Sequence, residues 1–414
     1  MDTIFKNVAG LDVHQKTIVA CVRKFQPQGG TEEEVRTFGT MTGDLLQMSD
    51  WLAKAGVTHV AMESTGVLWK PVWNILDGHF ELLLVNPREL KRVPGRKSDV
   101  SDSQWIAHLM QCGLLKSSFV PSRPQRELRE LTRQRTQLTR EQTRIVNRIH
   151  KTLEDANIKL GAVASDIMGK SGRAMLEALV AGERDPAKLA ELAERRMRVK
   201  IPALKQALQG HLTEHHVFLL KTLLAHLHFL EQQMAALSER IDVCLRPFLT
   251  PEQISRLDQI PGVNRRTIEN VIAELGSDMS RFPDEEHLSS WAGMCPGNEE
   301  SAGKRIRHRT TKGNTWLRSA LTEAAWAAGR TQKSYLGAQY RRLAARRGKK
   351  RALTAVGHTL LVIFYHMLKA EVTYKDLGPD FFNKLKPEQY RRYLVKRLES
   401  LGFTVELKPK DAAA

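Results

Sequence analysis

The chain has 414 residues and a formal net charge of +18, with 64 Lys and Arg against 46 Asp and Glu. This length suits two or three domains with hydrophobic cores of their own, and the positive charge favours a polyanionic partner. The four cysteines form no CxxC pair, which argues against a disulfide framework and a zinc site. No apolar segment has the features of a signal peptide or the length of a membrane span, so we expect a soluble intracellular protein without a membrane partner.

The first 120 residues alternate β-rich and helical segments. Strands are predicted at 7–13, 16–25, 33–40, 58–63 and 80–86. A helix is expected near 43–55 and another after the fourth strand, and a last helix would carry Trp105, Ile106, Leu109 and Met110 on one face. Three meandering strands followed by alternating helices and strands predict an α/β domain with a mixed sheet at 1–121.

From about residue 122 the hydrophobic pattern becomes that of long helices. An Arg-rich helix comes first, and a second long helix is expected at 204–245, with short helices and loops at 169–172 and 182–186 between them. The second helix carries an apolar seam spaced by four and three: Leu223, Leu227, Leu230, Met234, Leu237 and Ile241. Such a seam packs against a partner helix, either in an intrachain hairpin or in a second copy of the chain. We therefore predict a coiled-coil linker and oligomerisation region at 122–250.

The last third begins with two predicted helices around the tight turn of "IPGVNRR" (260–266). This pattern is typical of a helix-hairpin-helix unit, whose backbone N–H groups face a phosphate, but an ordinary αα-hairpin would give it too. Helices continue to about residue 370, and the tail after 404 is expected to fray. We predict a mainly helical domain at 251–375 and a C-terminal extension at 376–414.

Positive charge is concentrated between residues 301 and 351, where 15 Lys and Arg face a single acid, Glu323. A solvated basic face would normally carry interspersed acids, so this imbalance favours a nucleic-acid surface. The residues expected to contact phosphates are Lys304, Arg305, Arg307, Arg309, Lys312, Arg346, Arg347, Lys349 and Lys350.

Four carboxylates occupy positions that the fold alone does not explain. Asp12 lies at the end of the first predicted strand and Glu63 at the end of the fourth, although strands disfavour acids. Asp99 and Asp102 are three residues apart where the last helix of this domain begins, so they would share a helix face. A simpler reading is that they stabilise the helix N-terminus, with Ser98 or Ser101 as the N-cap.

The order strand, strand, helix is the one by which an RNase H-like nuclease domain brings four carboxylates to two divalent metals. Carboxylate oxygens suit Mg²⁺, and two such ions can activate a nucleophile and stabilise a leaving oxygen. We therefore predict that the four acids hold Mg²⁺, with two ions in one active site and Mn²⁺ as a substitute.

These acids, in "GLDVHQ", "ESTG" and "KSDVSDS", resemble those of the DEDD transposases of the insertion sequence 110 family, whose N-terminal domain is similar to the RuvC Holliday-junction resolvase. The resemblance covers roughly residues 8–370 and includes "LVNPRELKRVPGRKSDVSDSQWIAHLMQCGLL", "IPGVNRRTIENVIAELG" and "PGNEESAGKRIRHRTTKGNTWLRSAL". In one departure, Ser103 follows Asp102 where the family usually has alanine. The resemblance implies a RuvC-like α/β domain, a helical coiled-coil middle and a mainly α transposase domain.

The resemblance also implies a second catalytic element. A serine in the C-terminal domain of the family attacks DNA and forms a covalent phosphoserine, and the matching position is Ser301 in "EESAGKR". Other serines compete if the motif is set aside: Ser289, Ser290, Ser319 and Ser334. The family further implies a prokaryotic cytoplasmic protein, a homo-oligomer (dimer or tetramer) and a noncoding bridge RNA that pairs with donor and target DNA.

We therefore expect an RNA-guided DNA recombinase that excises and inserts its own mobile element. Two alternatives stay open. A metal-dependent junction resolvase would use only the N-terminal acids and a water nucleophile. A non-catalytic nucleic-acid-binding protein would need none of the acids for any reaction on DNA.

Overall fold

The computed structural model describes residues 4–407 except 27–29, 65, 91–92, 94–100, 296–298, 302–303, 308–309, 311 and 386, and for 88–89, 299–301, 304–307 and 389 it describes the backbone alone. The chain divides into two compact units, Met1–Pro121 and Ser122–Ala414. Each unit has its own core, so each is described by itself.

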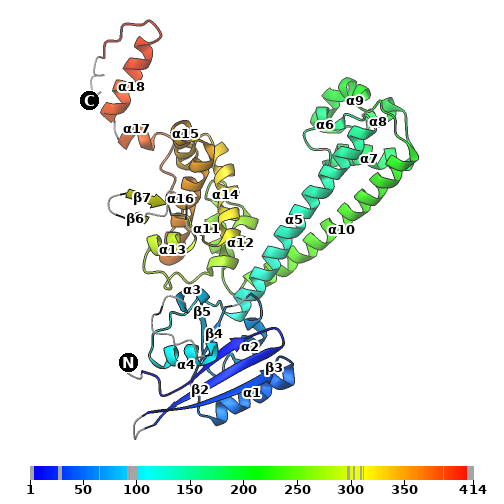
Figure 1. The fold of residues 1–414 in the computed structure, drawn as a ribbon. Helices are drawn as coiled ribbons and strands as arrows, with labels where there is room; N and C mark the ends of the chain where they lie inside the picture. The colour runs from blue at the N-terminus through cyan, green and yellow to red at the C-terminus, as the bar shows by residue number, and fades with distance from the viewer. Residues whose placement is uncertain are drawn as a thin grey trace. The chain divides into compact units, whose positions relative to one another are not determined.

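The first unit is built on a five-stranded sheet with the strand order β3-β2-β1-β4-β5 (Figure 1). Its strands are β1 (Asn7–Val13), β2 (Thr17–Phe25), β3 (Thr31–Gly39), β4 (His59–Glu63) and β5 (Glu81–Val85). The first three pair antiparallel, and β4 pairs parallel with both β1 and β5. The predicted mixed sheet is confirmed, with each strand within two residues of its expected bounds.

Helices cover both faces of this sheet, and the alternation of β1 decides which side chain faces which helix. The helices are α1 (Thr42–Lys54), α2 (Trp69–Leu76), α3 (Pro87–Leu90) and α4 (Asp102–Gln111). Leu11 packs with α1 and α2 in one core, and Val8 packs with α4 in the other. Because successive strand residues point to opposite faces, Gly10 and Asp12 share the face of Val8. The α4 residues Ile106 and Leu109 fill the core on that face.

The second unit begins with a long helical hairpin. Its two arms are α5 (Arg123–Asp155) and α10 (Glu214–Leu245), and the elements between them are α6 (Leu160–Val163), α7 (Lys170–Ala181), α8 (Pro186–Glu191), η1 (Arg195–Lys200) and α9 (Ile201–Ala207). The single helix predicted at 204–245 is therefore wrong. It is divided between α9 and α10, because Thr213 caps α10 and starts a new helix.

The loops expected inside the hairpin have different outcomes. A loop at 182–186 is confirmed, because Gly182 ends α7 in the left-handed region and Asp185 caps α8. The loop at 169–172 is wrong, because α7 already begins at Lys170, with Gly169 as its N-cap.

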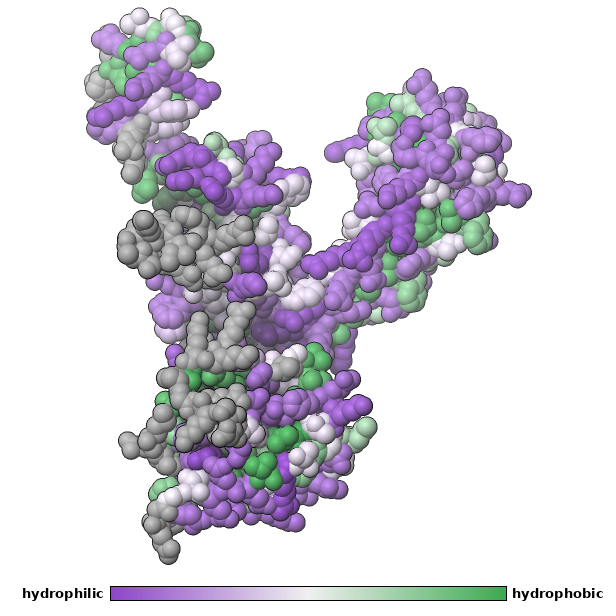
Figure 2. All heavy atoms as spheres, viewed as in Figure 1, coloured by the Kyte–Doolittle hydropathy of each residue, from purple (hydrophilic) through white to green (hydrophobic). Residues whose placement is uncertain are grey.

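The apolar seam of α10 packs within the chain. Leu227 and Leu230 are buried in one core with Ile145 and Ile149 of α5 and with Met175 of α7. Of the two partners that the seam allowed, the structure provides the intrachain one. Figure 2 shows mainly hydrophilic surface along α5 and green patches along α10, whose exposed apolar side chains are Phe218, Phe229 and Val243.

The rest of the second unit is a helical domain with one small hairpin of strands. Its elements are α11 (Pro251–Asp258), α12 (Arg265–Leu275), α13 (Glu285–Trp291), β6 (Glu299–Ser301), β7 (Lys304–Arg307), α14 (Thr315–Arg330), α15 (Tyr335–Arg347), α16 (Lys349–Ala370), α17 (Phe381–Leu385) and α18 (Pro387–Glu399). The two helices expected around the "IPGVNRR" turn are α11 and α12. The β6–β7 hairpin was not predicted.

Helix α16 is longer than any apolar segment expected from the sequence. By length and composition alone it is the one described helix that could cross a membrane. Val356, Leu360 and Phe364, however, are fully buried in the core that α16 forms with α12 and α14. Its apolar character is therefore explained by its place at the centre of this domain.

The packing of the seam gives a first prediction. Leu230→Asp should lower the free energy of unfolding by at least about 3 kcal/mol, because the buried methyl groups are lost and a carboxylate takes their place. The neighbouring Phe229 is 54% exposed, so Phe229→Asp is the matched control and should change stability by less than about 1 kcal/mol. Urea unfolding followed by circular dichroism measures both. Equal losses in the two variants would contradict the intrachain packing of the seam.

Candidate metal centre and nucleic-acid surface

Two of the predicted acids lie side by side on the sheet of the first unit. Strands β1 and β4 are parallel and Leu11 pairs with Met62, so the next residues, Asp12 and Glu63, follow on adjacent strands. Ala61 faces the α4 side of the sheet, and Glu63, two residues later, therefore faces the same side. Strand alternation thus directs both carboxylates toward α4.

Helix α4 brings the third acid, Asp102, to this face. Ser101 is its N-cap, with a capping box to Gln104, and Asp102 is its first residue. The helix lies directly on β1 at Gly10, where a Cβ atom would overlap the backbone of Ser103 and Ala107. Only glycine permits this approach. The helix start is thereby held above the strand that carries Asp12.

The electrostatics of Asp12 show that the three acids interact. Its pKa is raised, chiefly because the carboxyl is buried, and the negative charges of Asp102 and Glu63 raise it further. His14 opposes them, with its Nε2 3.1 Å from Oδ2 of Asp12. A divalent cation between the carboxylates would relieve the same repulsion.

The fourth predicted acid, Asp99, lies outside the described residues. Because α4 begins at Asp102, after an extended N-cap at Ser101, the expectation that the two aspartates share a face of this helix is wrong, and a role for Asp99 stays a prediction. Within the described parts of the chain, no group of three His, Cys, Asp or Glu is arranged to hold a metal ion. The donor set still fits Mg²⁺, because Asp12, Glu63 and Asp102 offer only carboxylate oxygens. The simpler reading of Asp102 also holds, since it occupies the first turn after the Ser101 cap.

Two models of known protein families match this sequence. A model of the IS110-family DEDD transposases matches residues 9–158, and a model described as the transposase IS116/IS110/IS902 family matches residues 254–341. Together the two matches span more than half of the sequence. The chain belongs to the IS110 family of transposases. The family that the motifs indicated is confirmed, and the protein is therefore an enzyme that recombines DNA.

Two solved structures are similar to part of this transposase. They are Thermus thermophilus RuvC and the same protein in complex with a Holliday junction substrate. Each is 13% identical, with a TM-score of 0.21, and the similarity covers 27% of this chain and 99% of the RuvC chain. A search of curated proteins found no match.

Ser301 of the transposase is the last residue of β6 and pairs with Lys304 of β7. Its side chain is outside the described atoms, so its role stays a prediction. Two competing serines have structural roles, because Ser289 is fully buried and Ser334 caps α15. Ser319 donates to Glu323 at 3.4 Å, whereas Ser290 is exposed.

The predicted phosphate contacts fall into three groups. Arg346, Arg347, Lys349, Lys350 and Lys312 are exposed. Lys304, Arg305 and Arg307 form β7, of which only the backbone is described, and Arg309 lies outside the described residues. Exposure of the first group is compatible with phosphate contacts, which stay a prediction.

Arg346 also lines a groove of about 610 Å³ between α15 and the C-terminal extension. Arg341 and Arg342 share this groove, and the extension contributes Tyr390 and Tyr393. The two rings are stacked, with centroids 6.4 Å apart. These tyrosines were not predicted, although their spacing of three on a basic helix was a signal. Arginines beside aromatic rings suit single-stranded nucleic acid.

The Gly10 contact gives a second prediction. Gly10→Val should push α4 away from β1, because the added atoms meet backbone that has no alternative rotamer. We expect a lower midpoint of thermal unfolding and the loss of DNA strand transfer. Gly43→Ala is the control, since a Cβ atom there meets nothing within 4 Å. A Gly10→Val protein as stable as the wild type would mean that α4 does not rest on β1.

Proposed function

We propose that this chain is an RNA-guided DNA transposase that excises and inserts its own mobile element, with a metal-binding carboxylate cluster and a nucleophilic serine. Membership of the IS110 family supports transposition. The proposal that the acids bind metal rests on one observation: the pairing of β1 with β4 and the start of α4 bring Asp12, Glu63 and Asp102 to one face of the sheet. Asp99 would complete the set.

The chain's own residues prepare this site in distinct ways. Asp12 and Glu63 are fixed by strand pairing, and Asp102 by the capped start of α4. His14 contacts Asp12 and would orient its carboxylate. Bound Mg²⁺, as a pair of ions, would supply charge neutralisation and polarisation of the phosphate oxygens. Mn²⁺ would serve in its place because it accepts similar oxygen ligands.

The covalent half of the proposal assigns the attack to Ser301. Its Oγ would form a bond to a DNA phosphorus while the bond from that phosphorus to the leaving sugar oxygen breaks. The serine proton would pass to a base or to water, and the leaving oxygen would take up a proton. Lys304 pairs with Ser301 in the backbone register of β6–β7, and its ammonium would contact the same phosphate.

Sequence choice would rest with a bridge RNA that pairs with donor and target DNA, as the family resemblance implies. A protein that delegates base reading to an RNA needs mainly backbone contacts. The excess of basic residues at 301–351 and the groove of Arg341, Arg342 and Arg346 would supply these contacts. A homo-oligomer, dimer or tetramer, would hold the two DNA duplexes.

The metal half can be tested with a change that preserves shape. Asp102→Asn should abolish strand transfer in Mg²⁺, because one anionic ligand is lost, while DNA binding persists. Asp50→Asn removes a charge from an exposed position on α1 and should retain activity. A strand-transfer assay on donor and target DNA, with a parallel gel-shift titration, measures both properties. Near wild-type recombination by Asp102→Asn would sink the metal assignment.

The covalent half is tested by trapping the protein on DNA. Wild-type protein should form an adduct that survives denaturation and maps to Ser301 by mass spectrometry. Ser301→Ala should form none, whereas Ser290→Ala, which changes an exposed serine nearby, should form it normally. An adduct on another residue would remove Ser301 from the mechanism. Cleavage by Ser301→Ala without any adduct would favour a water-using resolvase.

A further inference from the structure

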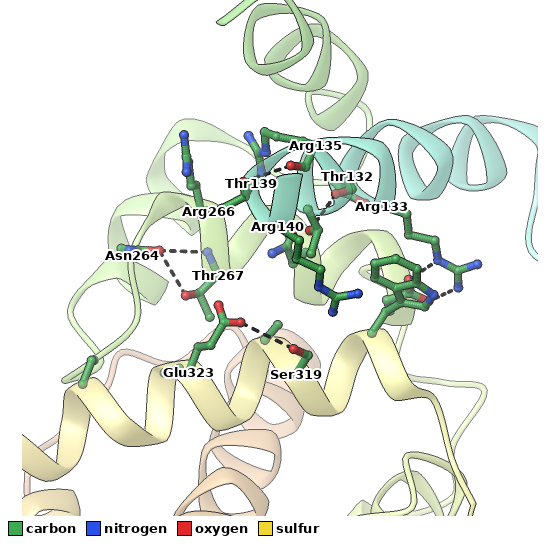
Figure 3. Close-up of a pocket in the computed structure, with 18 residues that line it drawn as sticks. Thr132, Arg133, Arg135, Thr139, Arg140, Asn264, Arg266, Thr267, Ser319 and Glu323 are labelled. Atoms are coloured by element: carbon green, nitrogen blue, oxygen red, sulfur yellow. Dashed lines mark hydrogen bonds and ion pairs between the residues drawn. The ribbon is translucent and has the colours of Figure 1, made fainter. Parts of the chain in front are cut away.

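A cavity of about 340 Å³ lies inside the second unit, between α5, α12 and α14 (Figure 3). We name it the Trp316 pocket. Its walls include Arg140 of α5, Arg266 and Asn270 of α12, and Trp316 and Glu323 of α14. None of these residues has a role in the proposed metal and serine chemistry.

Two of the arginines around the pocket are neutralised by buried acids. Arg133 makes a bidentate contact to Glu274, at 2.7 and 2.8 Å, and Glu274 is 2% exposed. Arg135 lies 2.6 Å from Glu269, and both side chains are almost fully buried. These pairs join α5 to α12 and shape the wall, so their charges are not available to a ligand.

Two other arginines that line the pocket have no acidic partner among the described residues. Arg140 and Arg266 have no acid within 4.0 Å in the described part of the chain, whereas Arg265 pairs with Asp242 and Glu269. The guanidinium of Arg140 lies 5.2 Å from the centre of the Trp316 ring, which holds it against the pocket wall (Figure 3). The pocket therefore has one unpaired cation beside the ring, Arg140, and a second, Arg266, whose exposed side chain points away from α14 (Figure 3).

The wall along α14 is largely apolar. It is formed by Ala320, Ala324 and Ala327 and by the Trp316 ring, and the guanidinium groups of Arg133 and Arg140 lie 5.5 and 5.2 Å from the centre of that ring. Beside it the Oδ1 of Asn270 is buried and has no hydrogen-bond partner among the described residues. Such an acceptor is costly unless a donor reaches it. The carboxylate of Glu323 is a second acceptor in the pocket.

A ligand that fits these walls has an anionic group, a flat ring and a hydrogen-bond donor. A nucleotide combines all three. Its phosphate would bind Arg140 and Arg266, its base would take the place of a guanidinium group on the Trp316 ring, and an amino or imino group would donate to Asn270. The volume is at the small end of ligand sites, which suits a single nucleotide and excludes a duplex.

We propose that the Trp316 pocket binds one unpaired nucleotide of a nucleic-acid strand. The inference rests on the proposed function, since it takes nucleic acid as the partner of this chain. A base can enter such a pocket only after it has left its stack, so a bulge, a loop or a displaced strand would be the source. The pocket would thereby distinguish unpaired from paired stretches at a fixed place on the protein.

The test compares binding to a short duplex, to the same duplex with one unpaired nucleotide, and to the free mononucleotide AMP, all without divalent metal. Wild-type protein should bind the bulged duplex more tightly than the perfect one. Trp316→Ala should weaken binding to the bulged duplex about tenfold, because base stacking is lost, and leave binding to the perfect duplex unchanged. Arg140→Gln should weaken it less, and more so at low salt.

The matched control is Trp326→Ala on the same helix. Trp326 is 49% exposed and stacks on Arg330 outside the pocket, so its loss should not affect bulge preference. Trp316→Phe keeps a ring and should recover most of the affinity, which separates stacking from misfolding. Anisotropy titrations measure all variants, and 5-bromouracil at the unpaired position should crosslink to Trp316.

Three outcomes would overturn the inference. They are an unchanged preference in Trp316→Ala, a crosslink to Tyr390 or Tyr393 instead, and tight AMP binding without any preference for the bulge. The last would assign the pocket to free nucleotides. These assays contain no divalent metal and need no catalysis. A failure of the recombination assays would therefore not affect the conclusion about the Trp316 pocket. A failure of the binding assays would likewise not affect the proposed metal centre.

Discussion

The contact between α4 and β1 at Gly10 determines the candidate metal centre. Like charges repel, so three carboxylates gather on one sheet face only where packing forces them together. Parallel pairing of β1 and β4 sets Asp12 beside Glu63, but the third acid comes from a helix, whose distance from the sheet depends on the residues between them. With glycine at the crossing point, the α4 backbone reaches the strand and its first residue, Asp102, comes within electrostatic reach of Asp12.

A second constraint orders the other unit. The Arg-rich helix α5 uses part of its charge internally, since Arg133 and Arg135 are paired with the buried Glu274 and Glu269 of α12. Breaking such pairs leaves a buried charge, which is costly. The neighbouring turn is fixed as well, because a side chain at Gly262 would overlap the backbone of α14. An arginine on this helix is therefore not by itself evidence of a nucleic-acid contact, and only the unpaired ones qualify.

The parts of the structure that local pattern governs could be predicted, and those that depend on long-range pairing could not. Strand alternation located the sheet and the acids Asp12 and Glu63, because period and position are properties of short segments. The apolar seam of α10 did not indicate which helix would pack against it. That partner, α5, is set by the long-range packing of the two arms of the hairpin. The β6–β7 hairpin was not predicted because "EESAGKRIR" lacks the alternation of β-branched and polar residues that indicates a strand. The Trp316 pocket could not be predicted because its walls come from α5 and, more than a hundred residues later in the chain, from α12 and α14. The signals were a single tryptophan and the "IPGVNRR" turn.

The charge distribution explains how one chain can combine an acidic site with a polyanionic partner. Residues 1–121 contain 13 Lys and Arg and 13 Asp and Glu, so the whole excess of +18 belongs to residues 122–414. A neutral unit with clustered carboxylates repels phosphate at close range, whereas the second unit attracts it at a distance. We therefore expect the affinity for nucleic acid to reside mainly in the second unit, and the proposed metal chemistry in the first. Cations at the acids would remove the remaining repulsion, so DNA could bind first and engage the carboxylates only with metal present.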